Sequence, residues 1–279
     1  MVTRLSSIDG KVCVQYQTEK GFKEENYDKV FLAAGAVNST RIVLNSLGRI
    51  DEKISLKSRG GFVLPILSLR PIKNDWPNVN TMPGIFIELK GSFLKHWVHV
   101  QLSTTNEMVI QKLKVPNKEG GWLGKLKRII SNHLMIALVN FHSDHSGEYK
   151  LWISKPKAQN QDNEQPTLNT KHIKKMPQLI TLIITCLRLT KVFWTISSIP
   201  LFPFARLNSG SYHVGCSLPM KENPSNPLET DTCGRISDIK NMHVVDTSVF
   251  TSLPGTTIGT LIMANAYRIV TESLKPRID

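Results

Sequence analysis

Apolar and polar residues alternate from the N-terminus of the chain onward. The segments TRLSSI and KVCVQYQ have the partial alternation of paired strands, and they flank Asp9-Gly10, a dipeptide favoured in tight hairpin turns. The first residues therefore predict a β-hairpin.

A strand, a glycine turn and a helix follow the hairpin. The apolar run Val30–Ala33 predicts a buried strand, and Gly35 predicts a tight turn. In the next stretch, NSTRIVLNSLG, apolar residues recur at helical spacing, which predicts a helix capped by Asn38 or Ser39 and ended by Gly48. Together these elements make half of a βαβ unit.

Short β-rich segments dominate between residues 60 and 155. Their number, and the turn residues between them, predict an antiparallel sheet of five or more strands, with one helix near WLGKLKRIISNHL. The segments are GFVLPILSL, GIFIELK, HWVHVQL, MVIQKLKV, MIALVNF and EYKLWIS.

The remaining segments are helical or rich in loops. We expect a long helix over residues 168–197, packed on the sheet, with a break or restart at Pro177. Residues 211–279 begin as loops and then predict a strand at Met242–Val245 and a helix that begins near Thr256. All these elements together predict an α+β fold.

The composition is that of an ordinary globular chain with a basic surface. Of 279 residues, 41% are hydrophobic and 20% are charged, which allows a sizeable core. The formal net charge is +13, and lysines gather in 112–128 and 155–175. Such clusters can attract phosphates or an anionic membrane surface, but no nucleic-acid-binding motif accompanies them. A solvated lysine-rich surface is the favoured interpretation, and nucleic acid is not an expected partner.

Cysteine spacing and hydropathy favour a cytoplasmic chain. The cysteines are scattered and form no CxxC pair, which argues against a zinc site and a disulfide scaffold and suits a reducing compartment. The N-terminal segment has no signal-peptide core. The most apolar region, residues 179–204, is interrupted by charged residues and prolines, so we expect a buried or interfacial helix and no transmembrane segment.

The segment HSDH raises the question of a metal site. It places His142 and His145 three residues apart, in a predicted turn before GEYKLW. No further Cys or His pair accompanies it, so the sequence predicts no metal site.

Three segments carry residues suited to catalysis or cofactor binding. They are VFLAAGAVNSTRIVLNSLG, SYHVGCSLPM and NMHVVDTSVFTSLPGTTIGTLIMANAYRI. The second contains His213. In the third, a strand ends at Asp246, and a Pro-Gly-Thr-Thr loop leads into a helix with no charge before Arg268. A surface helix normally carries charged residues, so the first turn of this helix is expected to face something other than water.

In this order, the three segments resemble the glucose–methanol–choline family of flavin-dependent oxidoreductases. In that family a strand followed by Ala-Ala-Gly-Ala closes the FAD-binding sheet. A histidine shortly before a glycine supplies the catalytic base, and a strand ending in aspartate leads into a helix against the flavin ring. Residues 27–48 and 210–270 carry the resemblance. It implies FAD as cofactor and hydride transfer from the CH–OH group of an alcohol or sugar-like substrate.

The resemblance also implies two domains and a set of site residues. Residues 1–55 and 211–279 would form the remnant of a βαβ FAD-binding domain, and residues 56–210 a substrate-binding domain whose antiparallel sheet is flanked by helices. His213 would be the catalytic base, assisted by Thr257. The implied cofactor-binding residues are Gly35, Asp246, Thr256, Thr257 and Ile258.

Each of these roles has a structural alternative. In the family, the helix N-terminus stabilises the negative charge of the reduced flavin, and Thr256–Ile258 would occupy that position. Asp246 would lie beside the ribityl chain of FAD. The alternative is a buried capping aspartate before a core helix. For His213 the alternative is a loop histidine held by hydrogen bonds.

The sequence departs from the family pattern at three places. Many members carry the catalytic histidine one residue earlier, where this chain has Tyr212. A second His or an Asn usually lies eleven residues after the aspartate, where this chain has Thr257. A threonine hydroxyl can donate and accept a hydrogen bond, but it cannot share a proton as histidine does. The family also begins with a GxGxxG fingerprint, and this sequence contains no Gly-x-Gly.

The missing fingerprint implies a C-terminal portion of a flavoenzyme. Without the helix N-terminus that binds the pyrophosphate, the chain alone is expected neither to retain FAD nor to be active. A split-enzyme half, a truncated gene product and a mis-called start all remain open, and a complementing chain with the nucleotide-binding unit is a possible partner. The alternative function is a catalytically inactive fragment or a basic interaction module without cofactor.

Overall fold

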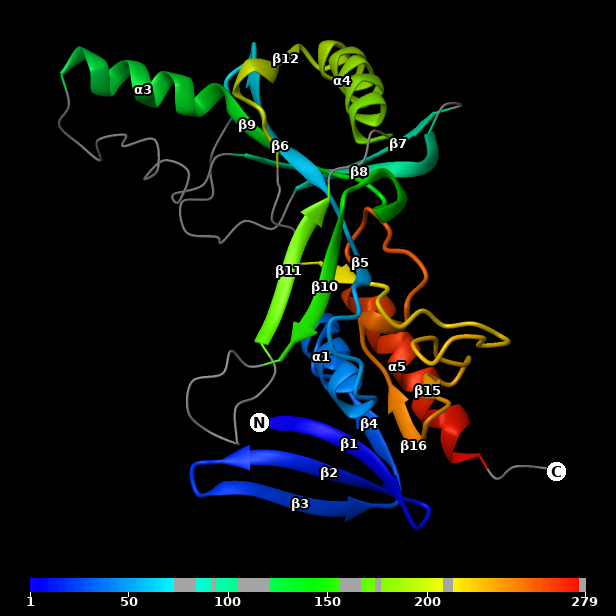
Figure 1. Ribbon diagram of the computed structural model, residues 1–279. Coiled ribbons are helices and arrows are strands. Elements are labelled where there is room, and N and C mark those ends of the chain that lie inside the picture. The colour runs from blue at the N-terminus through cyan, green and yellow to red at the C-terminus, as the bar shows by residue number, and fades with distance from the viewer. Residues whose placement is uncertain are drawn as a thin grey trace. The chain divides into compact units, whose positions relative to one another are not determined.

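The computed structural model describes residues 1–72, 84–91, 94–104, 121–155, 167–173, 177–207 and 213–275. In this part of the chain, four β-sheets and four α-helices form the predicted α+β fold (Figure 1). By its internal contacts the chain divides into a first unit, residues 1–59, 147–175 and 212–279, and a second unit, residues 60–146 and 176–211.

The predicted N-terminal hairpin is confirmed and has a third strand. β1 (Val2–Ile8), β2 (Lys11–Thr18) and β3 (Gly21–Tyr27) form an antiparallel sheet in that order. Asp9 and Gly10 both have positive φ, 49° and 79°, as a two-residue hairpin turn requires. All side chains of β3 are exposed, so no buried face marks this strand in the sequence.

A parallel strand pair lies in the first unit. β4 (Val30–Leu32) pairs with β16 (Ile239–Val244), and β15 (Arg235–Ile236) pairs antiparallel with β16. Helix α1 (Ala36–Ser46) begins directly after Gly35, whose φ of 81° reverses the chain. Capping by Asn38 or Ser39 is therefore a wrong prediction, because both residues already lie inside the helix. Gly48, at φ 65°, follows the helix end as predicted.

The second sheet of the first unit has the order β11-β10-β5-β14. Its strands are β5 (Ile54–Ser58), β10 (Glu148–Ser154), β11 (Thr167–Ile173) and β14 (Val214–Gly215). Residues 147–175 belong to the first unit because β10 pairs with β5, whereas the predicted range 56–210 includes them. The functional assignment of the two predicted ranges stays a prediction.

Two sequence expectations are corrected by this sheet. Residues 167–173 are a strand and not the start of a helix, because they pair with β10 along their whole length. Helix α4 (Pro177–Thr195) begins at Pro177, since proline suits a first helical position, where its missing N–H is not needed. In addition, EYKLWIS forms β10 and is not part of the large sheet of the second unit.

The second unit is built on a six-stranded antiparallel sheet in the order β12-β6-β9-β8-β7, with β13 also paired to β6. Its strands are β6 (Gly61–Ser68), β7 (Ile85–Gly91), β8 (Leu94–Thr104), β9 (Leu134–Asn140), β12 (Ser198–Pro200) and β13 (Arg206–Leu207). This confirms the predicted sheet. The segment MVIQKLKV lies outside the described residues.

Each unit has helices of its own. In the second unit, α4 packs Leu189 and Phe193 against the sheet residues Phe62 and Leu64, while α3 (Trp122–His133) precedes β9 (Figure 1). In the first unit, α5 (Gly259–Leu274) buries Ile269 in the core. No helix among the described residues is long and apolar enough to cross a bilayer.

Candidate functional site

The carboxyl ends of β4 and β16 lie next to each other in the first unit. Leu32 pairs with Val244, and the Val245 N–H donates to the Leu32 carbonyl at 3.0 Å. The Gly35 turn and Asp246 follow directly from these two ends. In open α/β sheets, ligands bind beyond the carboxyl ends of parallel strands, so this edge is the natural place to look for a site.

Asp246 organises the backbone at this edge. Its carboxylate is buried and accepts a hydrogen bond from the Ser39 hydroxyl at 2.5 Å and one from the Ser248 N–H at 2.9 Å. The Ser248 hydroxyl also donates to it. Asp246 thereby caps the short helix η3 (Thr247–Val249) and ties it to α1. The capping role, which is the alternative interpretation of the sequence, is present, and contact with a cofactor stays a prediction.

The segment after His213 is fixed to the segment after Asp246. The Cys216 N–H donates to the Thr247 carbonyl, and the Thr247 hydroxyl donates to the Val214 carbonyl, both at 2.9 Å. A Cβ atom on Gly215 would lie 2.5 Å from the Thr247 carbonyl oxygen. Glycine is therefore needed at position 215 for β14 to approach η3 this closely.

Arg59 joins His213 to the loop before α5. Its backbone N–H donates to the His213 carbonyl at 3.1 Å. Its guanidinium is buried, and Nη1 donates to the carbonyls of Gly255 at 3.1 Å and Thr256 at 2.7 Å. The predicted catalytic histidine and the predicted flavin-contacting loop thus depend on the same arginine, which the sequence interpretation missed. Its only sequence signal is a charged residue before Gly60-Gly61 within an otherwise β-rich region.

The surroundings of His213 favour its neutral form. Burial lowers the pKa of the His213 imidazole, and the nearby positive charge of Arg59 lowers it further. An imidazole that stays unprotonated at pH 7 can accept a proton, which is the property that a general base needs.

The N-terminus of α5 has no side-chain cap. The helix begins at Gly259, not near Thr256, so Thr256 and Thr257 precede it and Ile258 is its N-cap. Ile258 is buried against Cys216 and Leu253, and both threonines are exposed. No acidic residue occupies the first turn. No capping side chain accepts a hydrogen bond from the N–H groups of this turn, so these groups can interact with an anion.

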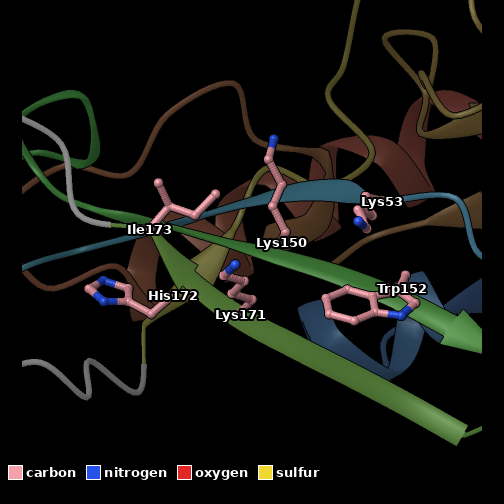
Figure 2. Close-up of a pocket in the computed structure, with 6 residues that line it drawn as sticks. All are labelled: Lys53, Lys150, Trp152, Lys171, His172 and Ile173. Carbon is pink, nitrogen blue, oxygen red and sulfur yellow. The ribbon is translucent and has the colours of Figure 1, made fainter.

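A basic pocket of about 520 Å³ lies elsewhere in the first unit, over the β10–β11 pair. Figure 2 shows its lining: Lys53, Lys150, Trp152, Lys171, His172 and Ile173. Lys150 pairs directly with Lys171 across the two strands, an arrangement of like charges that destabilises a sheet. The ammonium group of Lys53 lies 5.6 Å from the centre of the Trp152 ring. The pocket can attract an anion, but neither His213 nor the loop before α5 lines it.

Comparison with known proteins supports the fold class only. One solved structure with a similar fold is pyridoxine 4-oxidase from Mesorbium loti, with a TM-score of 0.56 and 13% sequence identity. The match covers 97% of this chain and 56% of the oxidase chain, so this chain spans little more than half of that protein. No protein-family model and no curated protein sequence matches the chain.

Proposed function

We propose that this chain is the C-terminal part of an FAD-dependent oxidoreductase that oxidises the CH–OH group of an alcohol or sugar-like substrate. One observation carries the proposal. Arg59 holds the backbone of His213 and the loop at Gly255 and Thr256 beside the uncapped N-terminus of α5. A base and an anion-stabilising helix end are the two protein groups that such an oxidation needs.

The residues at this edge fit a flavin. The first turn of α5 offers N–H groups that no side chain caps. At Gly35, no atom lies within 4 Å of the position that a Cβ would occupy, so a ring or chain can approach the backbone there. Thr256, Thr257 and Ile258 would hold the ring end of the cofactor. When bound, flavin would supply the hydride acceptor.

His213 would act on the substrate hydroxyl. Its neutral imidazole would take the hydroxyl proton while the C–H bond is broken, which leaves a carbonyl group as product. The positive charge of Arg59 disfavours protonation of the resting imidazole, so the base stays available at neutral pH. The exposed Thr257 hydroxyl would orient the substrate oxygen by a hydrogen bond.

Activity should require a second polypeptide segment. FAD affinity in related folds depends on a glycine-rich turn that places the pyrophosphate at a helix N-terminus, and this sequence has no Gly-x-Gly. We therefore propose that a segment with that unit, in the same polypeptide or in a complementing chain, completes the site.

The test is anaerobic reduction of FAD by a panel of primary and secondary alcohols, measured by loss of flavin absorbance. The chain is assayed alone and with the nucleotide-binding unit of a glucose–methanol–choline enzyme supplied in trans. We expect reduction only in the mixture. His213→Ala should abolish reduction and leave flavin bound, whereas His133→Ala, at a half-buried histidine outside every proposed site, should have no effect. Unchanged reduction with His213→Ala would overturn the assignment of the base.

The basic pocket favours a second candidate function, the binding of a phosphorylated anion without redox chemistry. The observation that supports this function is the pairing of Lys150 with Lys171, which places two positive charges in the pocket. Calorimetric titration with pyrophosphate should show binding that weakens with added salt and is lost in Lys150→Gln/Lys171→Gln. Binding that is absent, or that is indifferent to this double substitution, would exclude it.

A further inference from the structure

Histidines from two distant segments meet in the second unit. His99 on β8 pairs with Asn140 on β9. Because the strands are antiparallel, the segment before His99 lies level with the segment after Asn140. This register brings His96 to the short helix η1 (Ser143–His145), which follows β9. The sequence shows only the HSDH half of this cluster, because His96 stands more than forty positions upstream.

The side chains of His96, His142 and Asp144 are close enough to share one ion. One potential ligand atom from each lies within 4.8 Å of the others. His96 Nε2 is 3.3 Å from Asp144 Oδ2, and His142 Nδ1 is 3.7 Å from the same oxygen. Two ligands about 2.0–2.1 Å from a tetrahedral zinc ion lie about 3.3–3.4 Å apart. The observed distances are close to that spacing.

Two buried imidazole nitrogens of this cluster could serve as metal ligands. His145 Nε2 is buried and has no hydrogen-bond partner among the described residues, whereas His96 Nε2, also buried, faces the Asp144 carboxylate 3.3 Å away. The His145 ring lies edge-on to His96, and its Nδ1 is 3.3 Å from the Thr181 hydroxyl. Buried polar atoms normally have a partner, so the His145 nitrogen requires an explanation.

We propose that His96, His142 and Asp144 bind a divalent transition-metal ion of the zinc type. Two imidazoles and one carboxylate are a ligand set that zinc takes in proteins, whereas calcium and magnesium prefer oxygen ligands alone. The carboxylate offsets part of the charge of the ion. The Asp144 side chain is 34% exposed, which gives the ion a path from solvent. His145 or a water molecule would fill the fourth position.

Binding requires a local rearrangement. The His96 and His142 rings are stacked with their centres 3.6 Å apart, so their lone pairs must turn to converge on one point. His142 Nδ1 also accepts a hydrogen bond from the Asp144 N–H at 3.2 Å, which an ion at Nδ1 would replace. Both changes fall within η1 and the start of β8. The ion would tie these segments together, a role independent of the proposed oxidoreductase site.

The experiment is titration of the chelator-treated full chain with Zn²⁺, in competition with a chromophoric chelator, and with Co²⁺ followed by visible absorption. We expect one ion per chain and the intense visible absorption of tetrahedral Co²⁺. His96→Ala should raise the dissociation constant by more than ~100-fold, beyond the range seen for loss of an outer-shell partner. Asp144→Asn should also weaken binding, and it keeps the side-chain shape if an alanine variant disturbs the fold.

His172→Ala, which removes a histidine of the first unit, is the matched control and should bind as the parent chain does. Absence of saturable binding would overturn the proposal, as would binding that persists unchanged in both His96→Ala and Asp144→Asn. Circular dichroism of each variant shows that lost binding does not reflect lost structure.

Discussion

Replacing Gly215 by alanine is a direct test of the contact that fixes the His213 segment to the Asp246 segment. The new Cβ would lie 2.5 Å from the Thr247 carbonyl oxygen and 3.0 Å from the Thr247 Cβ. The oxygen belongs to the backbone, so it cannot turn away as the end of a flexible side chain can. β14 and η3 must therefore move apart.

The expected loss combines two contributions. Overpacking in a closely packed contact costs about 1–3 kcal/mol, and each of the two hydrogen bonds between Thr247 and β14 contributes about 1 kcal/mol. We expect destabilisation by about 3 kcal/mol when the bonds are partly retained. Gly259→Ala is the matched control, because no atom lies within 4 Å of its Cβ position. Gly259 is the exposed first residue of α5, so this change should alter stability by less than about 0.5 kcal/mol.

Native-state hydrogen exchange of the Cys216 amide, together with urea unfolding, measures the effect. A loss of 3 kcal/mol should reduce protection of this amide by about 100-fold, since each 1.4 kcal/mol is a factor of ten. Amide protection and an unfolding midpoint equal to those of the parent chain in Gly215→Ala would refute the reasoning. So would equal losses in Gly215→Ala and Gly259→Ala.

Three further predictions concern the same edge. Ser39→Ala removes a hydrogen bond to the buried Asp246 carboxylate and should lower the free energy of unfolding, measured in urea, by about 1.5–3 kcal/mol. A loss of less than about 0.5 kcal/mol would contradict this prediction. Burial lowers the pKa values of His213 and His243 in the folded chain. Below about pH 6.5 the unfolded chain therefore binds more protons than the folded chain, and thermal stability should fall as the pH is lowered further. A flat profile from pH 8 to 5 would count against this. Arg59→Met should raise the pKa of His213 in an NMR titration, and an unmoved or lowered value would exclude the role of its charge.

The parts of the fold that the sequence predicts are those determined by local chemistry. Asp9-Gly10 specifies its turn through backbone preference, and Gly48 ends its helix for the same reason. Position 39 shows where local preference fails to predict the structure. Serine is a good N-cap, but Gly35 reverses the chain four residues earlier and leaves Ser39 free to hold Asp246, a residue about 200 positions away in the chain.

The candidate site shows the same limit more strongly. The sequence proposes His213 and Thr257 from neighbouring motif residues. Arg59, which joins His213 to Gly255 and Thr256, stands in a different segment and acts through backbone carbonyls. Carbonyl groups are present at every position, so no residue pattern identifies this interaction. His96 likewise reaches His142 only through the register of β8 and β9. Contacts of this kind depend on tertiary structure and have no local sequence signal.

The parallel pairing of β4 with β16 has a consequence for how the chain is made. Val30 and Met242 are about 210 positions apart, and the entropy of closing a loop grows with its length. The ribosome must therefore deliver nearly the whole described chain before β4 finds its neighbour. Until then the apolar strand Val30–Leu32 has no parallel partner, and unpaired apolar strands favour aggregation. Completion of the first unit therefore depends on a contact between the two ends of the described chain.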